Sequence, residues 1–147
     1  MLIVILACVL LIATTTVIHY EALRGLSRRL PVLRIPNRSK LLVVMFTAFV
    51  AHALEIAVYG GSLFVLVGEF GVGKLAGTLG FSFINCLYFS AETYTSLGFG
   101  DLVPFGPVRL VAGTETLNGL LLIGWTASYT YIAMERFWHE DSPSKGA

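Results

Sequence analysis

The sequence predicts an all-α membrane protein of one compact domain, and three observations lead to that prediction. Of the 147 residues, 56% are hydrophobic and only 13% are charged, and the mean hydropathy is +0.79. Apolar runs of about 18 residues or more recur, and each is long enough to cross roughly 30 Å of hydrocarbon. A shorter apolar segment runs directly into a Gly-x-Gly sequence, which is typical of a helix that enters a membrane without crossing it. The bilayer is therefore the expected solvent.

Residues 1–19 form the first apolar run. A secretory signal peptide needs a basic region before such a run, whereas here the arginines follow it. We therefore expect a retained N-terminal transmembrane helix with its N-terminus outside the cell. The segment 20–40 carries six basic residues and one acidic residue, Glu21, and an excess of basic residues marks the cytoplasmic side.

The segment 20–40 leaves two interpretations open. Leu23, Leu26 and Leu30 recur at helical spacing beside the arginines, which fits a short amphipathic helix on the membrane surface that ends at Pro31. The alternative is a solvated basic connector. In either case the basic cluster is expected to attract anionic lipid.

The remaining chain divides by hydropathy. The segment 83–95 has about 13 residues, which is too short to cross at about 1.5 Å per residue, so we expect a re-entrant half-helix. Gly60 and Gly61 either weaken their helix or let a neighbour pack close. In chain order we expect an outer span at 41–59, an outer loop at 62–80, the half-helix, a tilted inner span at 108–134 and a short cytoplasmic tail at 135–147.

The segment Ser96-Leu97-Gly98-Phe99-Gly100 carries the chemistry. An ion that crosses hydrocarbon must exchange its water for fixed oxygens, and a ring of backbone carbonyls supplies them. Glycines at alternate positions permit left-handed dihedrals, so that Leu97 and Phe99 pack away from the carbonyls. The Ser96 hydroxyl adds an innermost oxygen, and the negative end of the half-helix dipole favours a cation below.

The sequence from Tyr88 to Pro104 resembles the pore signature of the two-helix potassium channel family, and Arg109-Leu110-Val111-Ala112 is similar to the start of its inner helix. The resemblance implies a pore domain at 41–134 (outer helix, pore helix with filter, inner helix) preceded by one extra transmembrane helix. It also implies a homotetramer around one ion path. Site residues follow from it as well: potassium coordination by Ser96, Leu97, Gly98 and Phe99, with Gly100 completing the filter, support from Glu92, Thr95 and Asp101, and a hinge at Gly119.

The filter departs from the family pattern at three positions. Ser96 stands for threonine, Leu97 for valine and Phe99 for tyrosine, and the leucine is the least usual of these. A weakly selective monovalent cation channel therefore stays open as an alternative. Glu92 and Asp101 match an acidic pair that shares a proton or a water behind the filter in some bacterial members, so one of the two pKa values is expected to rise.

Polar residues within the spans are expected to face protein, because an unpaired acid at mid-bilayer costs on the order of 3 kcal/mol. His52 and Glu55 share one helical face and form either a pH-sensitive pair or a packed contact between helices. Glu115 and Asn118 either line the cavity or brace the pore helix. Gly119 serves either bending or close packing.

The expected function is passive potassium conduction in a cell membrane, with a prokaryotic plasma membrane as the expected setting. A non-conducting scaffold or regulatory subunit is a further alternative. The net charge of +1 gives no indication of a nucleic-acid partner. No catalytic triad, metal-ligand cluster or cofactor loop is visible, so no enzyme activity and no cofactor besides permeant potassium are expected. The glycine-rich sequence 68–74 resembles a phosphate-binding loop, but Leu75 stands where serine or threonine belongs.

Overall fold

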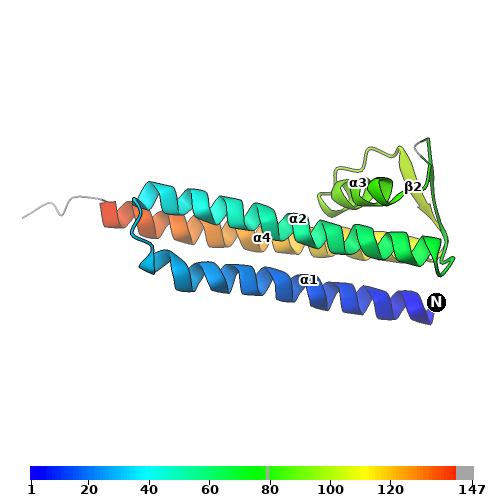
Figure 1. Ribbon diagram of the computed structural model, residues 1–147, viewed down its shortest axis with the longest axis horizontal. Helices are drawn as coiled ribbons and strands as arrows, with labels where there is room; N and C mark the ends of the chain where they lie inside the picture. The colour runs from blue at the N-terminus through cyan, green and yellow to red at the C-terminus, as the bar shows by residue number, and fades with distance from the viewer. Residues whose placement is uncertain (79, 142–147) are drawn as a thin grey trace, which may run out of the picture.

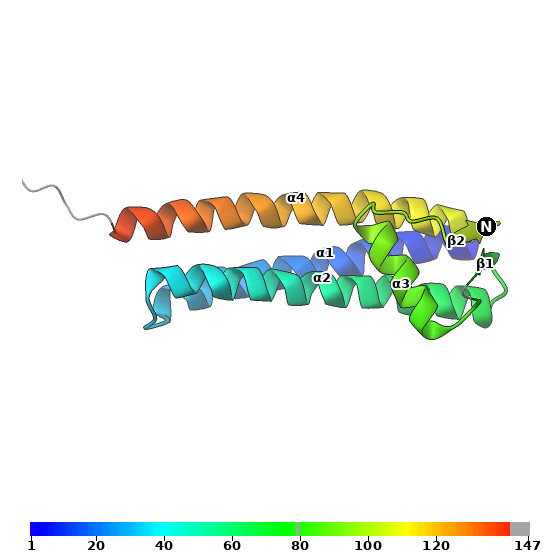
Figure 2. The same cartoon turned by 90° about the horizontal axis from the view of Figure 1, so that it is seen from above.

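Three long helices lie side by side in the computed structural model, which describes residues 1–78 and 80–141 (Figure 1). They are α1 (Leu2–Arg29), α2 (Asn37–Gly68) and α4 (Val108–Asp141). Helices α1 and α4 run in one direction and α2 runs in the other. A short helix, α3 (Phe83–Tyr94), packs against α2 and α4 on the side away from α1 (Figures 1 and 2). The predicted all-helical class is confirmed.

Helix α1 is longer than its apolar run. It continues through residue 19 to Arg29 and is followed by a 3-10 turn at Leu30–Val32 that contains the proline. Leu23, Leu26 and Leu30 are buried against Val44, Ala133 and Phe137. Both interpretations of the segment 20–40 are therefore wrong about its surroundings: the leucine spacing does mark a helix face, but that face packs on α2 and α4. The arginines at 24, 28 and 29 stay exposed.

Helix α2 passes through Gly60 and Gly61 without a break and ends at Gly68, inside the segment expected as outer loop. Gly60 is where α3 crosses. A Cβ atom there would lie 2.9 Å from Leu87 Cα and 3.2 Å from the Cys86 carbonyl oxygen, whereas a Cβ at Gly61 would meet nothing within 4 Å. Close packing rather than weakening is thus the role of Gly60.

Replacing Gly60 with alanine is expected to destabilise the protein by about 1–3 kcal/mol, because the added methyl meets backbone that cannot rotate away. Thermal unfolding of the purified protein measures this. The adjacent Gly61→Ala is the matched control and should leave the unfolding midpoint unchanged or slightly raised, since alanine favours helix. Equal midpoints for the two variants would contradict the close contact between α2 and α3.

Two short strands close the end of the molecule that carries the N-terminus (Figure 1). Strand β1 (Lys74–Gly77) pairs antiparallel with β2 (Leu102–Phe105), in a register that places Lys74 opposite Phe105 and Gly77 opposite Leu102. The sequence analysis predicted neither strand. The pairing ties the loop before α3 to the segment that follows Gly100, so both ends of the α3 segment are held.

Of the helices in the described part of the chain, α1 and α2 are long and apolar enough to cross a membrane. Helix α4 has 34 residues, about 50 Å of helix, but polar residues such as Glu115 and Asn118 interrupt its apolar sequence. It continues past residue 134 into the segment expected as a tail, of which 142–147 lie outside the described residues. The connection between α1 and α2 and the end of α4 lie at the end of the bundle opposite the two strands (Figure 1).

Candidate functional site

Helix α3 positions the candidate filter. It begins after Ser82, whose Oγ accepts a hydrogen bond from the Asn85 backbone N–H at 3.2 Å, a standard N-terminal cap. It ends at Tyr94, so its 12 residues span about 18 Å and cannot cross a membrane. The expected half-helix at 83–95 is confirmed, and its last turn runs directly into Ser96.

Left-handed backbone conformations alternate along the filter segment. The φ angles are +60° at Ser96, +56° at Gly98 and +80° at Gly100, while Leu97 and Phe99 do not have positive φ. The expected conformation of the two glycines is confirmed. Ser96 is the one non-glycine residue with positive φ in the described chain, a conformation that costs an L-residue about 1–2 kcal/mol. Such strain persists only where the surroundings hold it.

Glu92 provides several of the hydrogen bonds that fix the filter segment in this conformation. Its backbone carbonyl accepts hydrogen bonds from the amides of Leu97, at 2.8 Å, and Gly98, at 3.3 Å. Its carboxylate Oε2 accepts from the Phe99 N–H at 3.2 Å. One residue of α3 thus bonds three successive filter amides. Burial raises the pKa of Glu92, and the nearby Asp101 raises it further, although the bond from Phe99 acts in the opposite direction.

Asp101 and Thr95 lie at the two ends of the filter. The Tyr88 hydroxyl donates to Asp101 Oδ2 at 3.1 Å, and the Tyr88 ring stacks on Phe99 with centroids 6.5 Å apart. Tyr88 therefore links the acid outside the filter to a filter side chain, a contact that the sequence analysis missed. The Thr95 hydroxyl donates to the Ala91 carbonyl at 2.7 Å and so supports the last turn of α3.

The filter side chains Leu97 and Phe99 are only partly covered by the described part of their own chain. Leu97 is 59% exposed and Phe99 is 66% exposed. Apolar side chains of this size are costly to leave in water, at about 25 cal/mol per Å². The single chain therefore leaves this segment in need of a further apolar surface.

Gly119 of α4 lies against the end of α3. A Cβ atom at this position would come within 2.3 Å of the Tyr94 carbonyl oxygen and 3.0 Å of Tyr94 Cγ. Helix α4 is continuous through Gly119. This geometry favours the close-packing interpretation of Gly119, and its use as a hinge stays a prediction.

Glu115 is fully buried and contacts α3, which favours the bracing interpretation. Ser90 Oγ lies 2.8 Å from the Ile56 carbonyl oxygen and also bonds Glu115 Oε1. The serine hydroxyl has one hydrogen, so at any moment it donates either to the Ile56 carbonyl of α2 or to the Glu115 carboxyl of α4. Through these two contacts, Ser90 of α3 links α2 to α4.

Glutamine at position 115 is expected to preserve both stability and single-channel current, because its amide oxygen accepts a hydrogen bond from Ser90 as the carboxyl oxygen does. Thermal unfolding and single-channel recording of Glu115→Gln measure the two properties. Glu115→Ala is the comparison variant: it loses the bond and leaves a cavity, so its unfolding midpoint should fall. A reduced single-channel current in Glu115→Gln would instead indicate that this side chain lines the ion path.

Asn118 joins α1 to the pore unit, which we define as α2, α3, the filter segment and α4. Its Nδ2 donates to Thr15 Oγ1 at 2.7 Å and to the Tyr59 hydroxyl at 3.2 Å, and all three residues are buried. Asn118 therefore braces helices within the bundle. The sequence analysis missed Thr15 and Tyr59, and a polar residue inside an apolar run was the signal that pointed to them.

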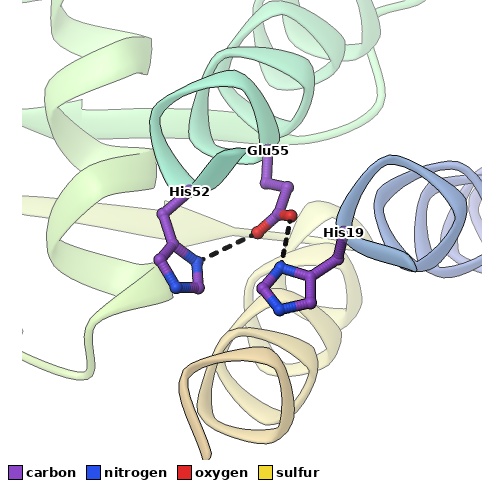
Figure 3. A group of neighbouring side chains, drawn as sticks. All are labelled: His19, His52 and Glu55. Carbon is purple, nitrogen blue, oxygen red and sulfur yellow. Dashed lines mark hydrogen bonds and ion pairs between the residues drawn. The ribbon is translucent and has the colours of Figure 1, made fainter. Parts of the chain in front are cut away.

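A second polar cluster lies further along the same helices (Figure 3). His52 Nδ1 lies 3.1 Å from Glu55 Oε2, as their spacing on one helix predicted, and His19 Nδ1 of α1 lies 2.9 Å from Glu55 Oε1. The Tyr94 hydroxyl donates to Glu55 as well. The packed-contact interpretation of His52 and Glu55 is thus confirmed, while pH sensing stays a prediction. His19 was missed, and with it a cluster of metal-ligating residue types that the sequence analysis did not see.

Comparison with known proteins gives one finding. The family model described as ion channel matches residues 39–136, about two thirds of the chain. The match contains α3, the filter segment and most of α2 and α4, and it begins after α1. Neither the search of curated proteins nor the search of solved structures returned a match.

Proposed function

Because the chain belongs to the two-transmembrane, pore-loop ion channel family, we propose that it is the subunit of a potassium-selective channel in which four copies surround one ion path. The observation that carries the proposal is the alternation of left-handed residues at Ser96, Gly98 and Gly100 directly after a half-helix. This backbone allows successive carbonyls to face one side while the side chains face the other.

In the proposed filter, the carbonyls of Ser96, Leu97, Gly98 and Phe99 replace the water shell of potassium, and the Ser96 hydroxyl adds the innermost oxygen. The bonds from Glu92 to the filter amides support this role, because they hold the strained segment in one conformation. Conduction is passive and needs no catalytic group and no bound cofactor.

Assembly is supported by what the single chain leaves exposed. Leu97 and Phe99 are mostly exposed, and α4 carries further exposed large apolar residues such as Leu117, Leu120 and Leu121. In a closed ring, neighbouring subunits and lipid cover these surfaces. The C-terminal end of each α3 then directs its negative dipole toward the axis, which favours a cation below the filter.

The proposed setting is a cell membrane, with prokaryotic plasma membrane as the expected one. The N-terminus and the two strands lie at one end of the bundle, and the connection between α1 and α2, which carries Arg34, lies at the other (Figure 1), followed by Arg38 in the first turn of α2. By the distribution of basic residues, the first end is outside the cell and the second is cytoplasmic. The exposed arginines near that connection are placed to attract anionic lipid.

The reversal potential of the purified protein in a planar bilayer under a potassium-to-sodium gradient tests the proposal. A value close to the potassium equilibrium potential is expected. A value near zero would instead establish the weakly selective cation channel that Leu97 leaves open. No current from a correctly assembled protein would establish the non-conducting scaffold. Cross-linking in mild detergent tests the assembly separately, and a purely monomeric or dimeric protein would exclude the ring.

A further inference from the structure

We infer that His19, His52 and Glu55 form a binding site for a divalent first-row transition-metal ion, with Zn²⁺ as the expected occupant, that joins α1 to the pore unit. The three side chains converge on one point from α1 and α2 (Figure 3). Their ligand atoms all lie within 4.8 Å of one another. The inference concerns binding alone and does not depend on conduction.

The donor set fits this class of ion. Two imidazoles and one carboxylate are the ligands that zinc uses where a fourth position stays open, and imidazole also suits nickel and cobalt. Ligands about 2.0–2.2 Å from a tetrahedral ion lie roughly 3.4 Å from one another. The distances of 2.9 Å and 3.1 Å from the two histidine Nδ1 atoms to the Glu55 oxygens are close to this value, so small side-chain movements would admit the ion.

Thr126 of α4 provides an independent observation. Its Oγ1 lies 3.1 Å from His19 Nε2 and 3.0 Å from His52 Nε2, so one hydroxyl meets the far nitrogens of both rings. A hydroxyl has one hydrogen and two lone pairs, and it can donate to only one of these nitrogens. If both rings bind an ion through Nδ1, each Nε2 carries a hydrogen and Thr126 accepts both. Hydrogen bonds of this kind orient histidine ligands in metal sites.

An ion bound to the two Nδ1 atoms takes the place of any hydrogen that they carry, and both Nε2 atoms keep their contact with the Thr126 hydroxyl.

A fourth ligand and an entry route are both present. The Tyr94 hydroxyl bonds Glu55 and lies 2.9 Å from His52 Nδ1, so it or a water can occupy the open position. His52 is partly exposed. It lies in a mostly apolar cleft whose other lining residues include Phe49, Thr95 and Ile123. The ion would therefore bind beside Tyr94, the last residue of α3 before the filter segment.

Titration of the full-length protein with Co²⁺, after EDTA treatment and removal of the chelator, tests the inference through the visible absorption of four-coordinate cobalt. Saturable absorption that Zn²⁺ displaces is expected in the wild type. Thr126→Val keeps the shape of the side chain but removes the shared hydroxyl, and it should weaken binding by about 10–100-fold. His19→Gln removes a ligand and should weaken binding at least as much. Addition of Zn²⁺ should raise the thermal unfolding midpoint of the wild type and not of His19→Gln.

His139→Gln is the matched control, because it makes the same chemical change at the third histidine of the sequence, and its affinity should equal that of the wild type. No saturable cobalt absorption in folded wild-type protein would overturn the inference. Equal affinities in the wild type and Thr126→Val, or a loss of binding in His139→Gln alone, would overturn it too. Thr126→Val keeps the test decisive if His19→Gln does not fold.

Discussion

Alanine at position 98 is expected to abolish potassium current while the protein still inserts and assembles. Gly98 has a φ of +56°, and this left-handed conformation costs an L-residue about 1–2 kcal/mol in each copy of the chain. The strain is relieved by rotation of a peptide plane, which turns a carbonyl away from the ion path. Potassium flux into vesicles that contain Gly98→Ala measures the loss.

The control for this variant is Gly25→Ala. Gly25 lies within α1, does not have positive φ, and has no heavy atom within 4 Å of an added Cβ. Its flux should match that of the wild type. Wild-type flux through Gly98→Ala would contradict the assignment of the filter to residues 96–100. The ring of four carbonyls formed by position 98 would then conduct normally although its backbone conformation had changed.

Alanine at position 119 is expected to cause a larger loss of stability than alanine at position 60. The added Cβ would lie 2.3 Å from the Tyr94 carbonyl oxygen, a backbone atom. Relief requires that α3 or α4 shift, and overpacking of this kind costs about 1–3 kcal/mol or more in each chain. Since Tyr94 lies two residues before Ser96, where the filter segment begins, the displacement should also reduce potassium flux. Thermal unfolding and flux measured on the same preparation record both effects.

Gly124→Ala, five positions further along α4, is the matched control, because an added Cβ there meets nothing within 4 Å. It should retain the wild-type unfolding midpoint. The two roles of Gly119 give different results in this comparison. A hinge would change the open probability of Gly119→Ala and leave its unfolding midpoint intact, whereas close packing lowers the midpoint and makes Gly119→Ala much worse than Gly124→Ala.

Several features of this protein could be predicted because they depend on short stretches of chain. The half-helix followed from a segment of about 13 residues that is too short to cross a bilayer. The left-handed glycines at 98 and 100 followed from their alternate spacing, since only glycine adopts that conformation at little cost. The contact of His52 with Glu55 followed from helical spacing. The burial of Glu115 followed from the cost of an acid in hydrocarbon.

Other features depend on pairs of residues far apart in the sequence. His19 meets Glu55 across 36 positions and Asn118 meets Thr15 across 103. Periodicity shows that each helix carries a polar residue on one face. It does not show which polar residues of different helices lie at the same level along the bundle. The spacing of the leucines at 23, 26 and 30 was ambiguous for a related reason. An apolar stripe on a helix can contact either a membrane surface or, as here, two neighbouring helices.

Local sequence patterns therefore predicted the long helices, the short helix α3, the left-handed glycines that follow it and the ion channel family. The tertiary structure alone decided that α1 joins the pore unit through two buried polar clusters, that Gly60 and Gly119 are the points where α3 approaches α2 and α4, and that two strands hold the ends of the pore segment. The physical reason is that hydropathy and backbone dihedrals act within a few residues. The relative depth and rotation of packed helices are set by side-chain shape across their interface.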